Sequence, residues 1–504
     1  MVLSQAKLVK NIMQAAEAGN ASAQCELGKL FYLGEGVTKD IPKSLELFQQ
    51  AAHGNNLDAQ YILGKVYLEG TVAPQDFNQS LFWFTRAAEN NHPLAEVELG
   101  LIYLNGHGVP ADPAIAFQWF LKAAQNGNVG AQYNLGLMYL NGHGTELDPT
   151  KAFYWFKQAA LKGDTLSKFY IGLMLFTGEG VPRENLEARE WFEKAAQDGD
   201  PSSLFYLGLM HEDGCGVPKD QLKALEYYKL GALQGDPKAQ YFLGTHYLAG
   251  QGVGKDEEEA YMWLLKAADA GHEYAAFELG LMLLYGTGVP IDLPHAFRRF
   301  TVASEAGLPG AAANLGSLYL KGMGTEVDYE KAFYWSFKGA EGGVGEAMLN
   351  LGLMYFYGRG IKRDYGKAMD LFRQAGENGT IAAYYELGLM YFQGIGVTRD
   401  YSQAFEYFDK AAKEGEINST MYAGLMLLNG YGVPADPKRG FELVKTAALT
   451  GLTEAEYFMG IIFLQGLGIP TNIPEAKEWL KKAAAKGHAA AAEEIKRLEQ
   501  SENI

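Results

Sequence analysis

Apolar and polar residues follow one pattern that returns every 36 residues along the chain. In residues 20–55 the apolar positions form two groups with helical spacings of three and four: Ala23, Leu27, Gly28 and Phe31, then Leu45, Phe48, Ala51 and Ala52. The pattern recurs as far as residue 487, which gives thirteen units of 36 residues. Units of this length bury their apolar faces only by stacking on their neighbours. The pattern therefore predicts an all-α solenoid of thirteen helix-turn-helix repeats.

A glycine stands in the middle of each predicted first helix, from Gly28 to Gly460 at intervals of 36 residues. Glycine inside a helix costs about 1 kcal/mol relative to alanine, so a close contact must require it. The second helix carries alanine at a constant position, such as Ala116, followed by aromatic residues such as Trp119 and Phe120. We expect the glycine to face this alanine, with the aromatic residues filling the space between repeats.

Two further positions mark the ends of the second helix. Asp40 and its equivalents precede it in nearly every repeat, and aspartate there accepts backbone N–H groups as an N-cap worth about 1 kcal/mol. These acids lie a whole repeat apart, too far for a shared metal ion. After the helix stands a glycine, or Asn55 and Asn91 in the first two repeats. Both residue types tolerate a left-handed backbone, so we expect positive φ there.

Outside residues 20–487 we predict a capping helix at each end. Residues 1–19 resemble a lone second helix, and residues 488–504 resemble a lone first helix with a short tail. In the latter, Lys496 replaces the glycine and Glu499 the aromatic residue. No further helix needs to approach there, so this end is a polar cap.

The recurring motif Ala-x-x-x-Leu-Gly-x-x-Tyr, Gly-x-Gly-Val, Asp, Ala-x-x-Trp-Phe-x-x-Ala-Ala, x-x-Gly closely resembles the Sel1-like repeat (SLR) family, which is related to the tetratricopeptide repeats. The resemblance covers residues 20–487 and implies a right-handed α/α superhelix. It also implies an adaptor that joins partners in signalling, envelope processes or host interaction. The chain is similar to the soluble, cysteine-poor branch, for which a bacterial source is expected.

Composition and charge limit the classes of partner that we expect the chain to bind. A net charge of −17 and a pI near 5.1 disfavour contact with nucleic acid or anionic lipid. No stretch approaches the roughly 20 apolar residues of a membrane span, so we expect no membrane insertion. The two cysteines, Cys25 and Cys215, stand in different repeats, which fits a reducing compartment. We expect a monomer in the cytoplasm; the alternative is export or injection into a host cell without an N-terminal signal peptide.

The clearest local anomaly is His211-Glu212-Asp213, which replaces a mostly apolar stretch such as Tyr139-Leu140. Two explanations stay open: these polar groups face a partner, or His211 is a core histidine satisfied by a neighbouring carboxylate. No Cys-x-x-Cys or His-x-x-x-His spacing accompanies it, and no glycine loop has a phosphate-binding context. We therefore predict no metal, no cofactor and no catalytic residue.

One stripe of the first helix changes in character from repeat to repeat, which indicates a free face. In the first repeat this variable stripe is Ser22, Glu26, Lys29 and Leu33. By similarity to tetratricopeptide proteins it lines a concave groove. The candidate partner-binding residues at the Glu26 position are Tyr170, Tyr206, Phe242, Asn134, Asn314, Asn350, Glu278, Tyr422 and Phe458. Either they form aromatic and polar peptide-binding patches, or a tight superhelix buries them between helices.

From these observations we predict a non-catalytic adaptor or scaffold that binds protein or peptide partners in its groove. Specificity would come from the aromatic patch Tyr170, Tyr206 and Phe242, with Asn and Glu side chains holding the ligand backbone. The rival functions are an activating or regulatory subunit of an enzyme and, through the family resemblance alone, a β-lactam-type hydrolase. The hydrolase lacks a recognisable catalytic group in this sequence.

Overall fold

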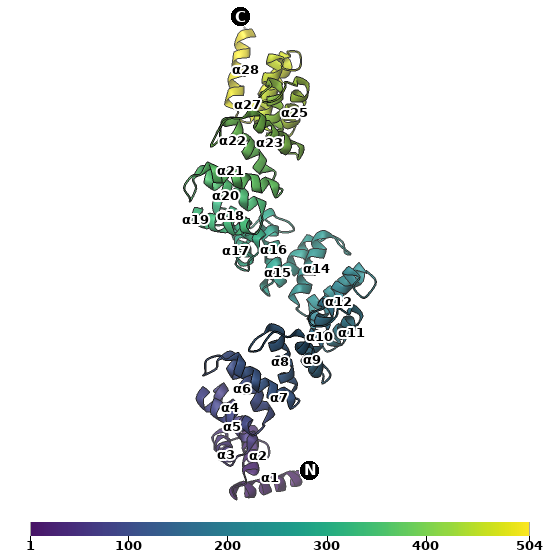
Figure 1. Ribbon diagram of the computed structural model, residues 1–504, viewed down its shortest axis with the longest axis vertical. Coiled ribbons are helices and arrows are strands. Elements are labelled where there is room, and N and C mark those ends of the chain that lie inside the picture. Colours follow the sequence, from purple (N-terminus) through teal and green to yellow (C-terminus); the bar gives the residue numbers. More distant parts are fainter. Residues whose placement is uncertain (1, 503–504) are drawn as a thin grey trace. The chain divides into compact units, whose positions relative to one another are not determined.

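The computed structural model describes residues 2–502, and within this range it contains 28 helices and no strand (Figure 1). Repeat one comprises residues 20–55, and the later repeats follow at 36-residue steps. The first helices are α2 (Ala21–Leu33), α4 (Leu57–Glu69), α6 (Pro93–Asn105), α8 (Val129–Asn141), α10 (Thr165–Thr177), α12 (Pro201–Asp213), α14 (Pro237–Ala249), α16 (Glu273–Tyr285), α18 (Pro309–Lys321), α20 (Gly345–Tyr357), α22 (Ala382–Gln393), α24 (Ile417–Asn429) and α26 (Thr453–Gln465).

The second helices alternate with them, and one more helix stands at each end. They are α3 (Ile41–His53), α5 (Phe77–Glu89), α7 (Pro113–Gln125), α9 (Pro149–Ala160), α11 (Asn185–Gln197), α13 (Gln221–Leu233), α15 (Glu257–Asp269), α17 (Leu293–Glu305), α19 (Tyr329–Glu341), α21 (Tyr365–Glu377), α23 (Tyr401–Lys413), α25 (Pro437–Leu449) and α27 (Ile473–Ala485). The end helices are α1 (Val2–Glu17) and α28 (Ala489–Glu502). The predicted all-α repeat solenoid is confirmed.

Apart from α14, each first helix packs against a neighbour on either side, as α8 does against α7 and α9. The contacts divide the chain into two compact units inside helix α14. The first unit runs to His246 and includes Gln251–Gly254; the second comprises Tyr247–Gly250 and continues from Lys255. In an array held by nearest-neighbour contacts, such a division does not interrupt the repeat pattern.

The predicted helix ends are present. A side-chain cap bond is made by twelve of the thirteen N-cap residues of the second helices, for example by Asp40 to the Lys43 amide. The exception is Glu184, whose longer side chain makes no such bond. After the second helix, Asn55 and Asn91 have φ of 62° and 64°, and the equivalent Gly127 has 86°. These residues reverse the chain after each second helix.

In nine repeats the mid-helix glycine faces an aromatic ring rather than the alanine that the sequence suggested, whereas Gly316, Gly424 and Gly460 face Ser336, Val444 and Leu480. A Cβ atom on Gly136 would lie 2.6 Å from the Phe156 ring, and one on Gly28 would lie 2.8 Å from the Phe48 ring. The equivalent alanines, such as Ala152, are fully buried but are not the closest groups at these two glycines. A methyl group at either glycine would clash unless the ring moved.

Candidate functional site

The variable stripe has an exposed border and a half-buried centre. The positions equivalent to Leu33 are exposed in all thirteen repeats, and those equivalent to Ser22 in most. The positions equivalent to Lys29 are half-buried throughout, and so are those equivalent to Glu26 in every repeat after the first. The candidate residues thus lie at the centre of a surface that is open along its borders.

Aromatic candidates at the Glu26 position lie flat on a buried ring of the preceding repeat. The Tyr170 and Phe156 ring centroids are 4.8 Å apart with 7° between the planes, and Tyr206 lies on Phe192 at 5.2 Å and 6°. Tyr422 stacks on Phe408 in the second unit at 4.9 Å and 13°. We call the space above the buried ring the ring slot.

Two further candidates depart from this geometry. Phe242 meets Tyr228 at 5.3 Å with the planes tilted by 40°. Phe458 has Val444 at the equivalent position of the preceding repeat, where no ring is available, and it contacts Tyr457 instead at 5.3 Å. Stacking therefore depends on an aromatic residue in both repeats.

The three aromatic residues of repeats five to seven are connected through their neighbours. Phe169 lies 5.7 Å from Tyr206, and Phe205 lies 5.1 Å from Phe242. Tyr170 approaches Tyr133, and burial followed by the neighbouring Tyr170 raises the pKa of Tyr133 to about 12. Each candidate ring therefore uses one face inside the array and keeps part of its surface toward the stripe.

The polar candidates lie at the same depth in other repeats. Asn134 and Asn314 each donate a hydrogen bond from Nδ2 to their own helix, to the carbonyls of Gly130 at 2.8 Å and Gly310 at 2.9 Å. Asn350 is half-buried. Burial raises the pKa of Glu278, since desolvation disfavours the charged carboxylate.

The sequence anomaly in α12 separates into three different environments. His211 is buried and stacks on Tyr227 with 5.6 Å between ring centroids. Burial, followed by the charge of Lys223, lowers the pKa of His211, and within residues 2–502 its Nδ1 atom has no hydrogen-bond partner. Glu212 turns toward the next repeat, whereas Asp213 is exposed on the variable stripe.

Glu212 joins a polar cluster that the sequence reasoning missed. Its carboxylate accepts a hydrogen bond of 2.5 Å from the Tyr228 hydroxyl and lies 3.5 Å from Nε2 of His246. The Nδ1 atom of His246 lies 2.7 Å from the Phe242 carbonyl. The sequence does contain a sign of this cluster, because two polar residues replace apolar ones at equivalent positions of the repeat. Tyr228 stands where Phe192 stands one repeat earlier, and His246 stands where Met210 does. Buried polar groups need hydrogen-bond partners, so three of them at apolar positions of neighbouring helices indicate that they pair with one another.

Charge and hydrogen bonding favour the ionised forms of Glu212 and His246 in this cluster. The hydrogen bond from His246, offset in part by burial and aided by Tyr228, lowers the pKa of Glu212. Burial alone would lower the pKa of His246, but Glu212 and the Phe242 carbonyl outweigh it and raise the pKa. Burial and Glu212 together raise the pKa of the Tyr228 hydroxyl, which stays protonated as a donor. The cluster fixes α12, α13 and the His246 turn of α14 to one another.

A pocket lies on the variable stripe between the first helices of repeats one and two. Its volume is about 280 Å³, and its lining residues are Lys29, Tyr32, Leu33, Phe48, Tyr61, Ile62, Lys65, Val66, Glu69, Thr71 and Val72. Ile62 stands at the Glu26 position of repeat two, and Phe48 is the buried ring of repeat one. The pocket is therefore a ring slot that lacks its ring.

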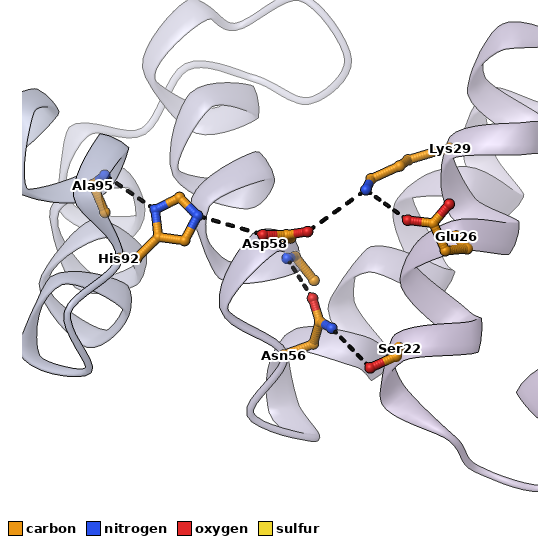
Figure 2. Close-up of polar contacts among 8 residues, drawn as sticks. Ser22, Glu26, Lys29, Asn56, Asp58, His92 and Ala95 are labelled. Carbon is orange, nitrogen blue, oxygen red and sulfur yellow. Dashed lines mark hydrogen bonds and ion pairs between the residues drawn. The ribbon is translucent and has the colours of Figure 1, made fainter. Parts of the chain in front are cut away.

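Ion pairs surround this pocket, and Figure 2 shows part of them. The Lys29 ammonium lies 2.7 Å from Glu26 and 3.7 Å from Asp58. Asp58 also faces Nε2 of His92 at 3.5 Å, while Nδ1 of His92 accepts the Ala95 amide hydrogen as an N-cap (Figure 2). This use of Nδ1 leaves the proton of neutral His92 on Nε2, directed at Asp58.

Neither a metal-binding cluster nor a membrane-spanning helix is present in the described part of the chain. Across residues 2–502, no three His, Cys, Asp or Glu side chains gather closely enough to hold a metal ion. No helix in that range is both long enough and apolar enough to cross a bilayer.

Comparison with known proteins gives a family match and two informative structures. The Sel1 repeat model matches residues 21–56, 57–92, 93–128, 129–164, 166–200, 201–236, 237–272, 273–308, 309–344, 345–380, 381–416, 419–451 and 453–488. A protective antigen of uropathogenic Escherichia coli strains with an SLR fold is 31% identical, with a TM-score of 0.60, over 96% of this chain and 97% of that one. A Sel1 repeat protein of Oxalobacter formigenes is 32% identical, with a TM-score of 0.52, over 61% of this chain and 89% of that one. The curated proteins gave no match.

Proposed function

Because the chain belongs to the Sel1 repeat family, we propose that it is a non-catalytic adaptor that binds protein or peptide partners along the variable stripe. The observation that supports this role is the construction of the stripe itself. Its borders are exposed, and its centre holds aromatic rings fixed by stacking, such as Tyr170 on Phe156. Aromatic side chains that are already ordered lose little entropy on binding and are enriched in interface hot spots.

Within the stripe, we assign the main contact to Tyr170, Tyr206 and Phe242 of repeats five to seven. These rings occupy consecutive repeats and connect through Phe169 and Phe205. A peptide lying along the stripe would meet one ring per repeat, with asparagine and glutamate side chains of the same register available to its backbone. Specificity would then follow from the order of ring and polar positions.

The test replaces the three rings with asparagine, the residue at the equivalent positions 134, 314 and 350. Tyr170→Asn, Tyr206→Asn and Phe242→Asn are combined, and captured proteins are compared with wild type by quantitative mass spectrometry. We expect at least a tenfold loss of the specific partner. The variant should remain helical but less stable, because each lost ring contact removes about 0.5–1.5 kcal/mol.

A matched control removes similar apolar surface away from the stripe. Leu161→Asn, Leu186→Asn and Leu222→Asn replace leucines that are 67%, 62% and 70% exposed on second helices or at their ends. This control should capture the partner as wild type does. Equal capture by both triple variants would reject the assignment to repeats five to seven.

For location, we propose the cytoplasm, with export or delivery to a host cell as the alternative. The similarity to a protective antigen of uropathogenic Escherichia coli is the reason for keeping export as the alternative. Fractionation of the native cells, with detection in cytoplasm, envelope and medium, separates the two. A protein found only in the cytoplasmic fraction would reject export.

A further inference from the structure

The array contains a ring slot whose floor and walls are formed but whose ring is missing. In repeat five the slot above Phe156 holds Tyr170, and in repeat six the slot above Phe192 holds Tyr206. In repeat two the residue at the same position is Ile62, and the space above Phe48 is the pocket of about 280 Å³. The filled slots thus show what the open slot is shaped to hold.

The volume and lining of this slot suit an aromatic side chain. Besides Phe48 and Ile62, its walls include Tyr32, Tyr61 and Val66. A dry apolar cavity of roughly 150 Å³ is enough to bind benzene, so the open slot has room for a phenyl or phenol ring. In the filled slots, a ring meets its floor at centroid distances of 4.8–5.2 Å, the range of favourable aromatic pairs.

The charged residues around the slot determine which residues can flank the bound ring in a partner. The two lysines at its edge, Lys29 and Lys65, each lie within 4 Å of two carboxylates; the four carboxylates belong to Glu26, Asp58, Glu69 and Glu98. Carboxylates therefore outnumber ammonium groups, and Glu26 and Asp58 are 57% and 62% exposed. Figure 2 shows Lys29 held between these two acids. Such an edge attracts cations and repels anions.

We propose that the open ring slot of repeat two binds an aromatic side chain of a partner peptide whose neighbouring residues are basic. The ring lies on Phe48 as Tyr170 lies on Phe156, and the basic residues face Glu26 and Asp58. This inference rests on the proposed peptide-binding function and names a second contact point, three repeats before Tyr170. The inference also specifies the kind of peptide sequence that this slot recognises.

The experiment uses the full chain and a labelled synthetic peptide with a central phenylalanine and lysines on both sides. Binding is measured by fluorescence anisotropy, with alanine-centred and glutamate-flanked peptides as comparisons. We expect saturable binding of the phenylalanine-lysine peptide, at least tenfold weaker binding of the alanine peptide, and none of the glutamate peptide. Binding of the first peptide should weaken as salt concentration rises.

The decisive variant is Ile62→Phe, which supplies the missing ring from within the chain. It should weaken peptide binding at least tenfold while the protein stays folded, because Tyr170 and Tyr206 occupy the same position over a buried ring in repeats five and six. The matched control is Ile115→Phe, the same change at a partly exposed site on α7, and it should bind as wild type does. Equal binding by Ile62→Phe, no binding by wild type, or preference for the glutamate peptide would each overturn the inference.

This proposal and the proposed function fail separately. The peptide assay needs no contact at Tyr170, Tyr206 or Phe242, so the asparagine triple variant should bind the peptide normally. If wild type forms a dimer in sedimentation analysis and Ile62→Phe is a monomer, a second copy fills the slot and the peptide proposal is wrong. If capture depends on repeats five to seven but the peptide does not bind, only the open-slot inference fails.

Discussion

Repeats two and five have the same backbone plan but opposite ring slots. In repeat five, Tyr170 covers Phe156; in repeat two, Ile62 leaves the pocket above Phe48 open. Both floor rings are packed from below by a mid-helix glycine, Gly136 or Gly28. The comparison shows that, where the preceding repeat supplies a buried ring, one side chain of the next repeat decides whether the slot above it is filled from within. Binding positions can therefore differ between repeats without any change in fold.

The largest expected contrast comes from adding a methyl group under each floor ring. In Gly136→Ala the new Cβ would lie 2.6 Å from Phe156, which Tyr170 holds in place from above. Overpacking costs about 1–3 kcal/mol, which exceeds the gain of about 1 kcal/mol in helix propensity. In Gly28→Ala, Phe48 can move toward the pocket, so we expect little net change.

Urea unfolding of both variants measures this contrast. Gly136→Ala should lower the transition midpoint, whereas Gly28→Ala should leave it unchanged or raise it slightly. An equal loss in both variants would mean that the pocket above Phe48 gives the ring no freedom to move.

A smaller effect is expected when the two slot residues are exchanged. Tyr170→Ile removes one stacked ring and should destabilise the protein by about 0.5–1.5 kcal/mol. Ile62→Tyr adds a ring on Phe48 and should stabilise the protein by less, because the ring replaces Ile62, which already packs against the cluster that contains Phe48. Differential scanning calorimetry of each single variant and of the double variant gives both changes. Stabilisation by Tyr170→Ile would contradict the role given to stacking.

The smallest effect concerns a carboxyl group at the Glu26 position of repeat eight, where the preceding repeat has Leu264 in place of a buried ring. Burial raises the pKa of Glu278 above its usual 4.5, so the folded protein holds this proton more tightly than the unfolded chain does. Its contribution is therefore most favourable at low pH and is lost as pH rises through the folded pKa. Glu278→Gln should raise the melting temperature at pH 7 by a few degrees or less and have little effect below pH about 4. A lower melting temperature at pH 7 would show that the charged form is stabilised instead.

Much of the fold follows from local chemistry that is visible in the sequence. The glycine and asparagine positions after the second helix require a left-handed backbone, and Asp40 and its equivalents suit an N-cap, so both could be read from one repeat. The residue that contacts the mid-helix glycine could not be predicted in this way, because the candidate alanine and phenylalanine lie on the same predicted helix. Which of them faces the glycine depends on the rotation of the second helix.

The site was less predictable because its geometry joins residues of different repeats. The sequence singled out Tyr170 but left open whether its side chain was exposed or buried. In the structure the side chain is half-buried, because one face of its ring stacks on Phe156. Ile62 drew no notice, because an isoleucine in a helix is ordinary until the ring below it is known. Similarly, Glu212 was recognisable as a polar residue at an apolar position of the repeat. Its pairing with Tyr228 and His246 could be predicted only by comparing the unusual residues of three helices, α12, α13 and α14.

The ring slot has a consequence for how such an array changes over generations. The codons of isoleucine and phenylalanine are neighbours in the genetic code, so a point mutation at the Ile62 position can close a recognition site. The reverse mutation in another copy of the motif can open one. Because the backbone of the repeat is unaffected, a lineage can gain or lose individual ligand contacts by single mutations while the protein remains folded.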